Sequence, residues 1–177
     1  MKIGEKDVSK WTLLMSIGSV LMVASFFLSL VGVEMLGKGF AISGLELVTG
    51  FDMGIKEIGS DDLSFYRYIP AICALIGVFV AAVSFASIFN EVTSRKLFTG
   101  ISITLTITLL LQVIFLMGGT SIEIFTGSVK DLLKGIGATF RPMIGTYVSV
   151  ISTFKALAII PIVHGATCLP RLTVSMV

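Results

Sequence analysis

The sequence predicts an all-α membrane protein, a four-transmembrane-helix bundle with a small extramembrane loop region suited to short β-strands. Of its 177 residues, 55% are hydrophobic and only 14% are charged, whereas soluble domains have about 25% charged residues. The charges gather between long apolar runs, and one such run, Leu97–Met117, contains neither a charge nor a proline. As a helix rising about 1.5 Å per residue it would be about 30 Å long, which matches the hydrocarbon core of a bilayer.

Four apolar runs of this kind define a single membrane domain. The predicted spans are residues 12–33, 68–89, 97–117 and 143–163, and the predicted outer loops are residues 34–67 and 118–142. The short connection between the second and third runs makes these two spans antiparallel neighbours. Lysines before the first run also suit a signal peptide, but this run exceeds the usual apolar length of about 7–15 residues and no small-residue cleavage site follows it.

The outer loops contain segments with their own periodicity. Phe40–Phe51 is divided by glycines and predicts a short strand or hairpin, and the alternating Ser121–Phe125 predicts another strand. Ser128–Lys134 has its apolar residues at helical spacing and predicts a short interfacial helix. The candidate interaction residues of the first loop are Ser43, Gly44, Glu46 and Gly50. The simpler interpretation is an ordered surface loop, because most loop residues bind nothing.

Small residues recur at four-residue spacing in the predicted spans and indicate close helix packing. Such residues lie on one helix face and let a neighbouring helix approach closely. The predicted packing residues are Gly77, Ala81, Gly100, Gly145 and Ser149.

The third span also has a weakly polar stripe, in which Thr104, Thr108 and Gln112 follow Gly100 at four-residue steps. Threonine hydroxyls in membrane helices mostly bond to carbonyls of their own helix, while the amide of Gln112 is expected to face another helix. The alternative is that the stripe lines a pathway together with Lys155. Packing is the favoured interpretation, because ion and proton pathways usually contain ionisable groups.

Lys155 is the only charged residue within the four runs. It would lie about 18 Å from the start of its span, in the far half of the bilayer. A lysine there either extends its charged end to the headgroups or lies buried beside a partner. Because none of the runs contains a carboxylate, the sequence predicts the first arrangement.

The sequence offers little for catalysis or metal binding. Its two cysteines, Cys73 and Cys168, form no CxxC pair, and His164 is the only histidine. No Ser/His/Asp set or carboxylate pair is placed for acid–base chemistry. We therefore expect no catalytic residue, cofactor or metal. A net charge of +2 without a run of Lys and Arg also argues against nucleic acid as a partner.

The layout resembles that of tetraspan, claudin-like proteins, with a long strand-forming first outer loop, a tight inner turn and a shorter second outer loop. The Trp-Gly-Leu-Trp run and paired cysteines of claudins are absent, so the resemblance covers topology and assigns no residues. Ser43–Gly50 (SGLELVTG) is also similar to a motif in small four-helix membrane proteins of prokaryotes. These proteins mostly have no assigned function.

These observations predict a multi-pass plasma-membrane protein with a structural or interaction role. Lys2, Lys6 and Lys10 precede the first run and favour cytoplasmic N and C termini. The expected partners are membrane lipids and either copies of the same chain or other membrane subunits. The alternative function is a channel or transporter subunit, with a pathway lined by the threonines of the third span and by Lys155.

Overall fold

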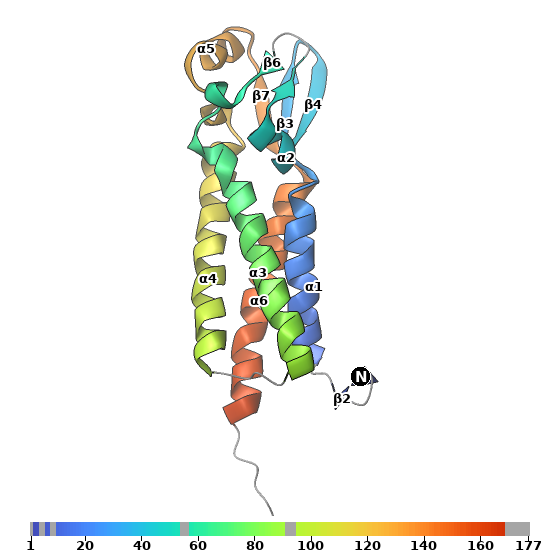
Figure 1. The fold of residues 1–177 in the computed structure, drawn as a ribbon. Coiled ribbons are helices and arrows are strands. Elements are labelled where there is room, and N and C mark those ends of the chain that lie inside the picture. The colour runs from blue at the N-terminus through green and yellow to red at the C-terminus, as the bar shows by residue number, and fades with distance from the viewer. Residues whose placement is uncertain (1, 4–5, 8–9, 54–56, 91–94, 169–177) are drawn as a thin grey trace, which may run out of the picture.

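The computed structural model describes residues 2–3, 6–7, 10–53, 57–90 and 95–168. The protein is mostly helical (70%), and the described part contains six α-helices and a small antiparallel sheet. The long helices lie side by side, and the sheet lies at one end of them (Figure 1). These helices are α1 (Lys10–Ser25), α3 (Tyr68–Asn90), α4 (Arg95–Ile114) and α6 (Ile144–Cys168). Helix α1 packs against α3 and α6, and α4 packs against the same two helices.

The three-stranded sheet has the order β4-β3-β7, and both pairings are antiparallel. Its strands are β3 (Ser29–Met35), β4 (Lys38–Ser43) and β7 (Thr139–Pro142). The shorter elements are β1 (Lys2–Ile3), β2 (Lys6–Asp7), α2 (Gly44–Thr49), β5 (Phe51–Asp52), β6 (Glu57–Ile58), α5 (Gly127–Gly135), the 3-10 turns Ser60–Asp62, Phe65–Arg67 and Ile122–Ile124, and the π-helix Phe115–Gly119. The sheet, α2 and α5 together form what we call the cap.

The predicted four-transmembrane-helix fold is wrong. Within the described residues, two helices are long and apolar enough to cross a membrane, Phe65–Ser87 and Thr99–Gly119. The apolar helical segments of the other two long helices, Leu13–Ser25 and Ile144–Ala158, are shorter. The presence of a sheet also overturns the all-α class. The predicted spans at 68–89 and 97–117 correspond to the two helices that remain candidates.

The first predicted span, residues 12–33, fails because its second part is a strand. Helix α1 ends at Ser25, and β3 begins at Ser29. From Leu30 to Val33 every residue of β3 is buried, because the strand is central in the sheet and covered on both faces. Such a strand is apolar throughout and lacks the alternation that distinguishes a strand from a helix.

The predictions for the loops had mixed outcomes. The strand prediction for Phe40–Phe51 holds at its two ends, in β4 up to Ser43 and in β5 from Phe51, but α2 lies between them. The predicted strand Ser121–Phe125 is wrong, since this segment forms a 3-10 turn and a single bridge from Phe125 to Leu63. The predicted helix Ser128–Lys134 is confirmed as α5, whose Lys130 forms an ion pair of 2.5 Å with Glu123. This hydrogen-bonded lysine lowers the pKa of Glu123.

The apolar core is divided between the cap and the helices. The larger cluster includes Val31 and Ile42 of the cap, and it extends to Phe125 and to Cys73 of α3. The cluster between the helices is small, and Leu105 and Val80 are among its members. Much of the remaining space between the helices holds buried serine and threonine, namely Ser16, Ser19, Ser84, Thr108, Ser149, Ser152 and Thr153.

Candidate functional site

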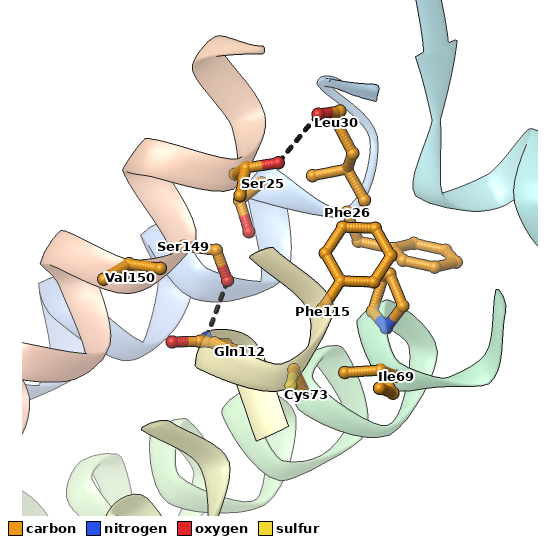
Figure 2. A pocket seen from close by; sticks show the side chains of 11 residues that line it. Ser25, Phe26, Leu30, Ile69, Cys73, Gln112, Phe115, Ser149 and Val150 are labelled. Carbon is orange, nitrogen blue, oxygen red and sulfur yellow. Dashed lines mark hydrogen bonds between the residues drawn. The ribbon is translucent and has the colours of Figure 1, made fainter. Parts of the chain in front are cut away.

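A small cavity lies where the helices meet the cap, and it is lined by residues of all four long helices and the start of β3 (Figure 2). Its lining residues are Ser25, Phe26, Leu30, Ile69, Pro70, Cys73, Gln112, Phe115, Thr146, Ser149 and Val150. Phe115 is the first residue of the π-helix that follows α4. Single π-helical turns change the direction of side chains and are frequent at functional sites.

Gln112 is the main polar residue of this cavity, and it connects α4 to α6. Its Nε2 donates hydrogen bonds to Ser149 Oγ at 2.7 Å and to Thr153 Oγ1 at 2.8 Å; Figure 2 shows the first of them. The Gln112 side chain is only 4% exposed. Its Oε1 has no hydrogen-bond partner among the described residues. The Gln112 amide therefore joins α4 to α6 through two hydrogen bonds.

The size of the cavity limits what it can bind. Its volume is about 20 Å³. A water molecule needs about 10–15 Å³ on the same measure, whereas pockets for small organic ligands measure about 300–1,000 Å³. The cavity therefore accommodates about one water molecule and no substrate. Its lining is mostly apolar apart from hydroxyls, the Gln112 amide and the Cys73 thiol.

The described part of the chain holds no group of three or more His, Cys, Asp or Glu side chains that could bind a metal ion. Cys73 is buried and forms no disulfide. Neither the cavity nor its surroundings place a nucleophile beside a general base. The arrangement around Gln112 therefore supports helix packing and offers no evident reaction chemistry.

The residues of the predicted pathway differ in burial, because Thr108 and Gln112 are buried and Lys155 is exposed. The hydroxyl of Thr104 donates to Gly100 O at 2.9 Å, and that of Thr108 donates to Thr104 O at 2.8 Å. Both therefore satisfy carbonyls of their own helix. Lys155 is exposed on the surface of α6, whereas Gln112 is buried inside.

The predicted packing residues fall into two groups. A Cβ atom at Gly77 would lie 2.9 Å from Met22 Cε, and one at Gly145 would lie 2.8 Å from Ser29 O, so both glycines lie against a neighbouring segment. Ala81 and Ser149 are buried as well. Gly100 differs, because it is exposed and a Cβ there would meet nothing within 4 Å.

The predicted interaction residues of the first outer loop build α2. Ser43 is the N-cap of this helix; its backbone N–H donates to Glu46 Oε2 at 2.7 Å, and its Oγ accepts from Glu46 N at 3.3 Å. This reciprocal pair is a capping box, and the Ser-x-x-Glu spacing could have predicted a helix here instead of a strand. Gly44 lies against Phe26, and Gly50 ends the helix with a φ of +92°.

Sequence reasoning missed two contacts of α6. The hydroxyl of Thr146 donates to Leu30 O at 2.7 Å and joins α6 to the first residues of β3. Gly18 of α1 lies opposite Ala156 of α6. A Cβ atom added at Gly18 would lie 3.6 Å from the Cβ atom of Ala156. Thr146 lies three residues before Ser149 on the same helix face, so the small-residue spacing of α6 contained this signal.

No protein-family model matches this chain, and no curated protein matches it in sequence. The resemblance to claudin-like proteins therefore stays a prediction. Functional proposals for this chain rest on the geometry of its own residues.

Replacing Gln112 tests the polar contact between α4 and α6. Gln112→Leu is expected to lower the free energy of unfolding in detergent by about 0.6 kcal/mol, the average for a hydrogen bond between membrane helices, and by no more than about 1.7 kcal/mol, the maximum. Chemical or thermal unfolding measures this change. Thr104→Val is the matched control on the same helix, because it removes a hydroxyl that bonds only within α4. Equal losses in the two variants would contradict the assigned role of Gln112.

Proposed function

We propose that this chain is a non-catalytic integral membrane protein that acts as an interaction subunit of a membrane complex. The observation that carries the proposal is the arrangement of polar and apolar side chains in its helices, which is the reverse of that in a soluble helix bundle. Hydroxyl and amide side chains lie between the helices, and large apolar side chains cover their outer surface. Lipid tails are as apolar as such a surface and can contact it directly. In membranes, small and polar residues form the contacts between helices.

The two candidate spans support this proposal quantitatively. In an apolar stretch of 18 residues within each helix, only 39% is buried in Phe65–Ser87 and only 28% in Thr99–Gly119. A core helix of a soluble protein is mostly buried instead. Leu75, for example, is 71% exposed. Contiguous exposed apolar surface on this scale indicates contact with lipid or with another protein. We infer that α3 and α4 cross the bilayer and that α1 and α6 pack against them.

Exposed aromatic residues at the cap end of the helices support a position for the membrane surface. Phe65, 64% exposed, lies just before α3, Tyr68 begins that helix, and Tyr147 lies in the first turn of α6. The guanidinium of Arg67 lies 4.4 Å from the centre of the Tyr68 ring. Aromatic residues of this kind gather at the level of lipid headgroups, so we place the cap just outside the bilayer.

The proposed orientation has the cap outside the plasma membrane and the opposite end of the helices on the cytoplasmic side, because Lys2, Lys6 and Lys10 lie at that opposite end (Figure 1). Cysteines placed at Lys38 in the β3–β4 hairpin and at Asp131 in α5 should react with an impermeant thiol reagent in intact cells, since both positions are exposed in the cap. Labelling after permeabilisation measures the total amount of reactive cysteine in each variant. The unsubstituted chain, which contains Cys73 and Cys168, gives the background.

Two outcomes would contradict parts of this proposal. Labelling of Lys38→Cys and Asp131→Cys only after permeabilisation would reverse the orientation and leave the membrane location intact. Release of the unsubstituted protein from membranes by alkaline carbonate would contradict insertion itself.

A further inference from the structure

Lys155 lies on an exposed apolar face of α6. Ile151, Phe154 and Ala158 are exposed beside it at helical spacing, while α1 and α4 pack against other parts of the helix. Ile151 and Phe154 are large and apolar. Lys155 is the only charged residue among the described side chains of α6.

The contacts of α6 place Lys155 close to the middle of the helices. Its neighbour Ala156 packs against Gly18, and Gly18 lies halfway along α1 (Lys10–Ser25). At a rise of about 1.5 Å per residue, either end of α1 is about 10–12 Å away. If the helices lie in a bilayer as proposed above, Lys155 is at mid-depth and on the outside of the protein.

The geometry of α6 also makes it hard for Lys155 to reach headgroups. Cα–Cβ bonds tilt toward the N-terminus of a helix, and the N-terminus of α6 is at the cap. On that side Tyr147, which lies at the proposed headgroup level, is about 12 Å away along the helix at 1.5 Å per residue. This is farther than a four-carbon side chain extends. A lysine left in lipid at this depth is strongly unfavourable unless a partner group contacts it.

The part of the chain that the structure describes offers no partner for this charge. Helices α1, α3, α4 and α6 contain no Asp or Glu, and Lys155 forms no ion pair with the described residues. A second copy of the chain would present the same carboxylate-free helices and another lysine, and like charges repel. The occupant with complementary charge is therefore a different protein.

We propose that the α6 face around Lys155 binds a transmembrane helix of a partner protein that carries a single Asp or Glu near mid-membrane. This inference rests on the proposed membrane location. The apolar residues Ile151 and Phe154 would pack against the partner helix, and its carboxylate would pair with the Lys155 ammonium. In a medium of low dielectric constant such a pair is much stronger than in water, so it selects partners that place an acid at this depth.

A defined peptide tests the proposal. The purified full chain, carrying a fluorescent donor on a cysteine at Lys38, is reconstituted into phosphatidylcholine vesicles with a leucine-rich transmembrane peptide that carries an acceptor. The peptide has one Glu at its centre, and a matched peptide has Leu there. Energy transfer measures association. We expect the Glu peptide to associate at least about tenfold more tightly than the Leu peptide, given the cost of an unpaired lysine at this depth.

Variants at the same position complete the test. Lys155→Met should remove the preference for the Glu peptide, and Lys155→Arg should retain it. Equal association of both peptides with the unsubstituted chain, or an unchanged preference in Lys155→Met, would overturn the proposal. Carbonate extraction of the same vesicles separates this failure from failure of the proposed function, because a protein that stays in the vesicles without any preference contradicts only the docking inference.

Discussion

Gly77→Leu is expected to lower the free energy of unfolding by about 3 kcal/mol, at the upper end of the effects of overpacking. A Cβ atom alone would lie 2.9 Å from Met22 Cε, 3.0 Å from Val23 Cγ2 and 3.2 Å from Ser19 O. The other leucine atoms would enter the α1–α3 contact, and the backbone of α1 would have to move. Replacing glycine within a helix recovers only about 1 kcal/mol. Thermal or denaturant unfolding in detergent measures the loss.

Gly100→Leu is the control for this variant. The substitution is the same, the residue also lies in a long helix, and a Cβ there would meet nothing within 4 Å. Its stability should be unchanged or slightly raised by the better helix propensity of leucine. If the two variants unfolded at the same temperature, the close α1–α3 contact at Gly77 would be wrong.

Gly44→Val should have an effect of similar size, about 3 kcal/mol, at the junction of the cap and α1. A Cβ at Gly44 would lie 2.5 Å from Phe26 Cδ2 and 2.7 Å from Phe26 O. The carbonyl cannot move aside without losing its hydrogen bond from Gly44 N, which measures 2.9 Å. The variant should lower the unfolding temperature and make the cap more susceptible to proteases.

Gly39→Val in the preceding strand, β4, provides the comparison. Gly39 lies in β4, where a Cβ would meet nothing within 4 Å and where valine is favoured by strand propensity. Its protease resistance should equal that of the unsubstituted chain. Equal susceptibility of both variants would show that Gly44 does not hold the cap to α1.

The sequence predicted the apolar helices 68–89 and 97–117 and the amphipathic α5, because each has a strong pattern of its own. It could not separate α1 from β3, since a central strand covered on both faces is as apolar as a helix in lipid. The capping box at Ser43 indicates the start of α2, but the pattern of glycines and apolar residues around it favoured a strand.

The candidate site was predictable in type but not in geometry. An amide in an apolar helix indicates a contact with another helix, and Gln112 contacts Ser149 and Thr153 of α6. Spacing alone could not distinguish Gly77 from Gly100, because the difference lies in which helix is adjacent. The position of Lys155 opposite the middle of α1 likewise depends on the contact between Ala156 and Gly18, which joins distant parts of the chain.

The pairing of β3 with β7 determines when the cap can be completed during synthesis. Strand β3 joins its hairpin partner β4 locally, but Val31 also pairs with Pro142, after α3, α4 and α5 have been made. Contacts between such distant segments form slowly. Until β7 emerges, one edge of β3 has unpaired backbone groups, and such edges recruit other strands. The nascent chain is therefore most prone to aggregate between synthesis of β4 and of β7, and chains that end in that interval retain the open edge.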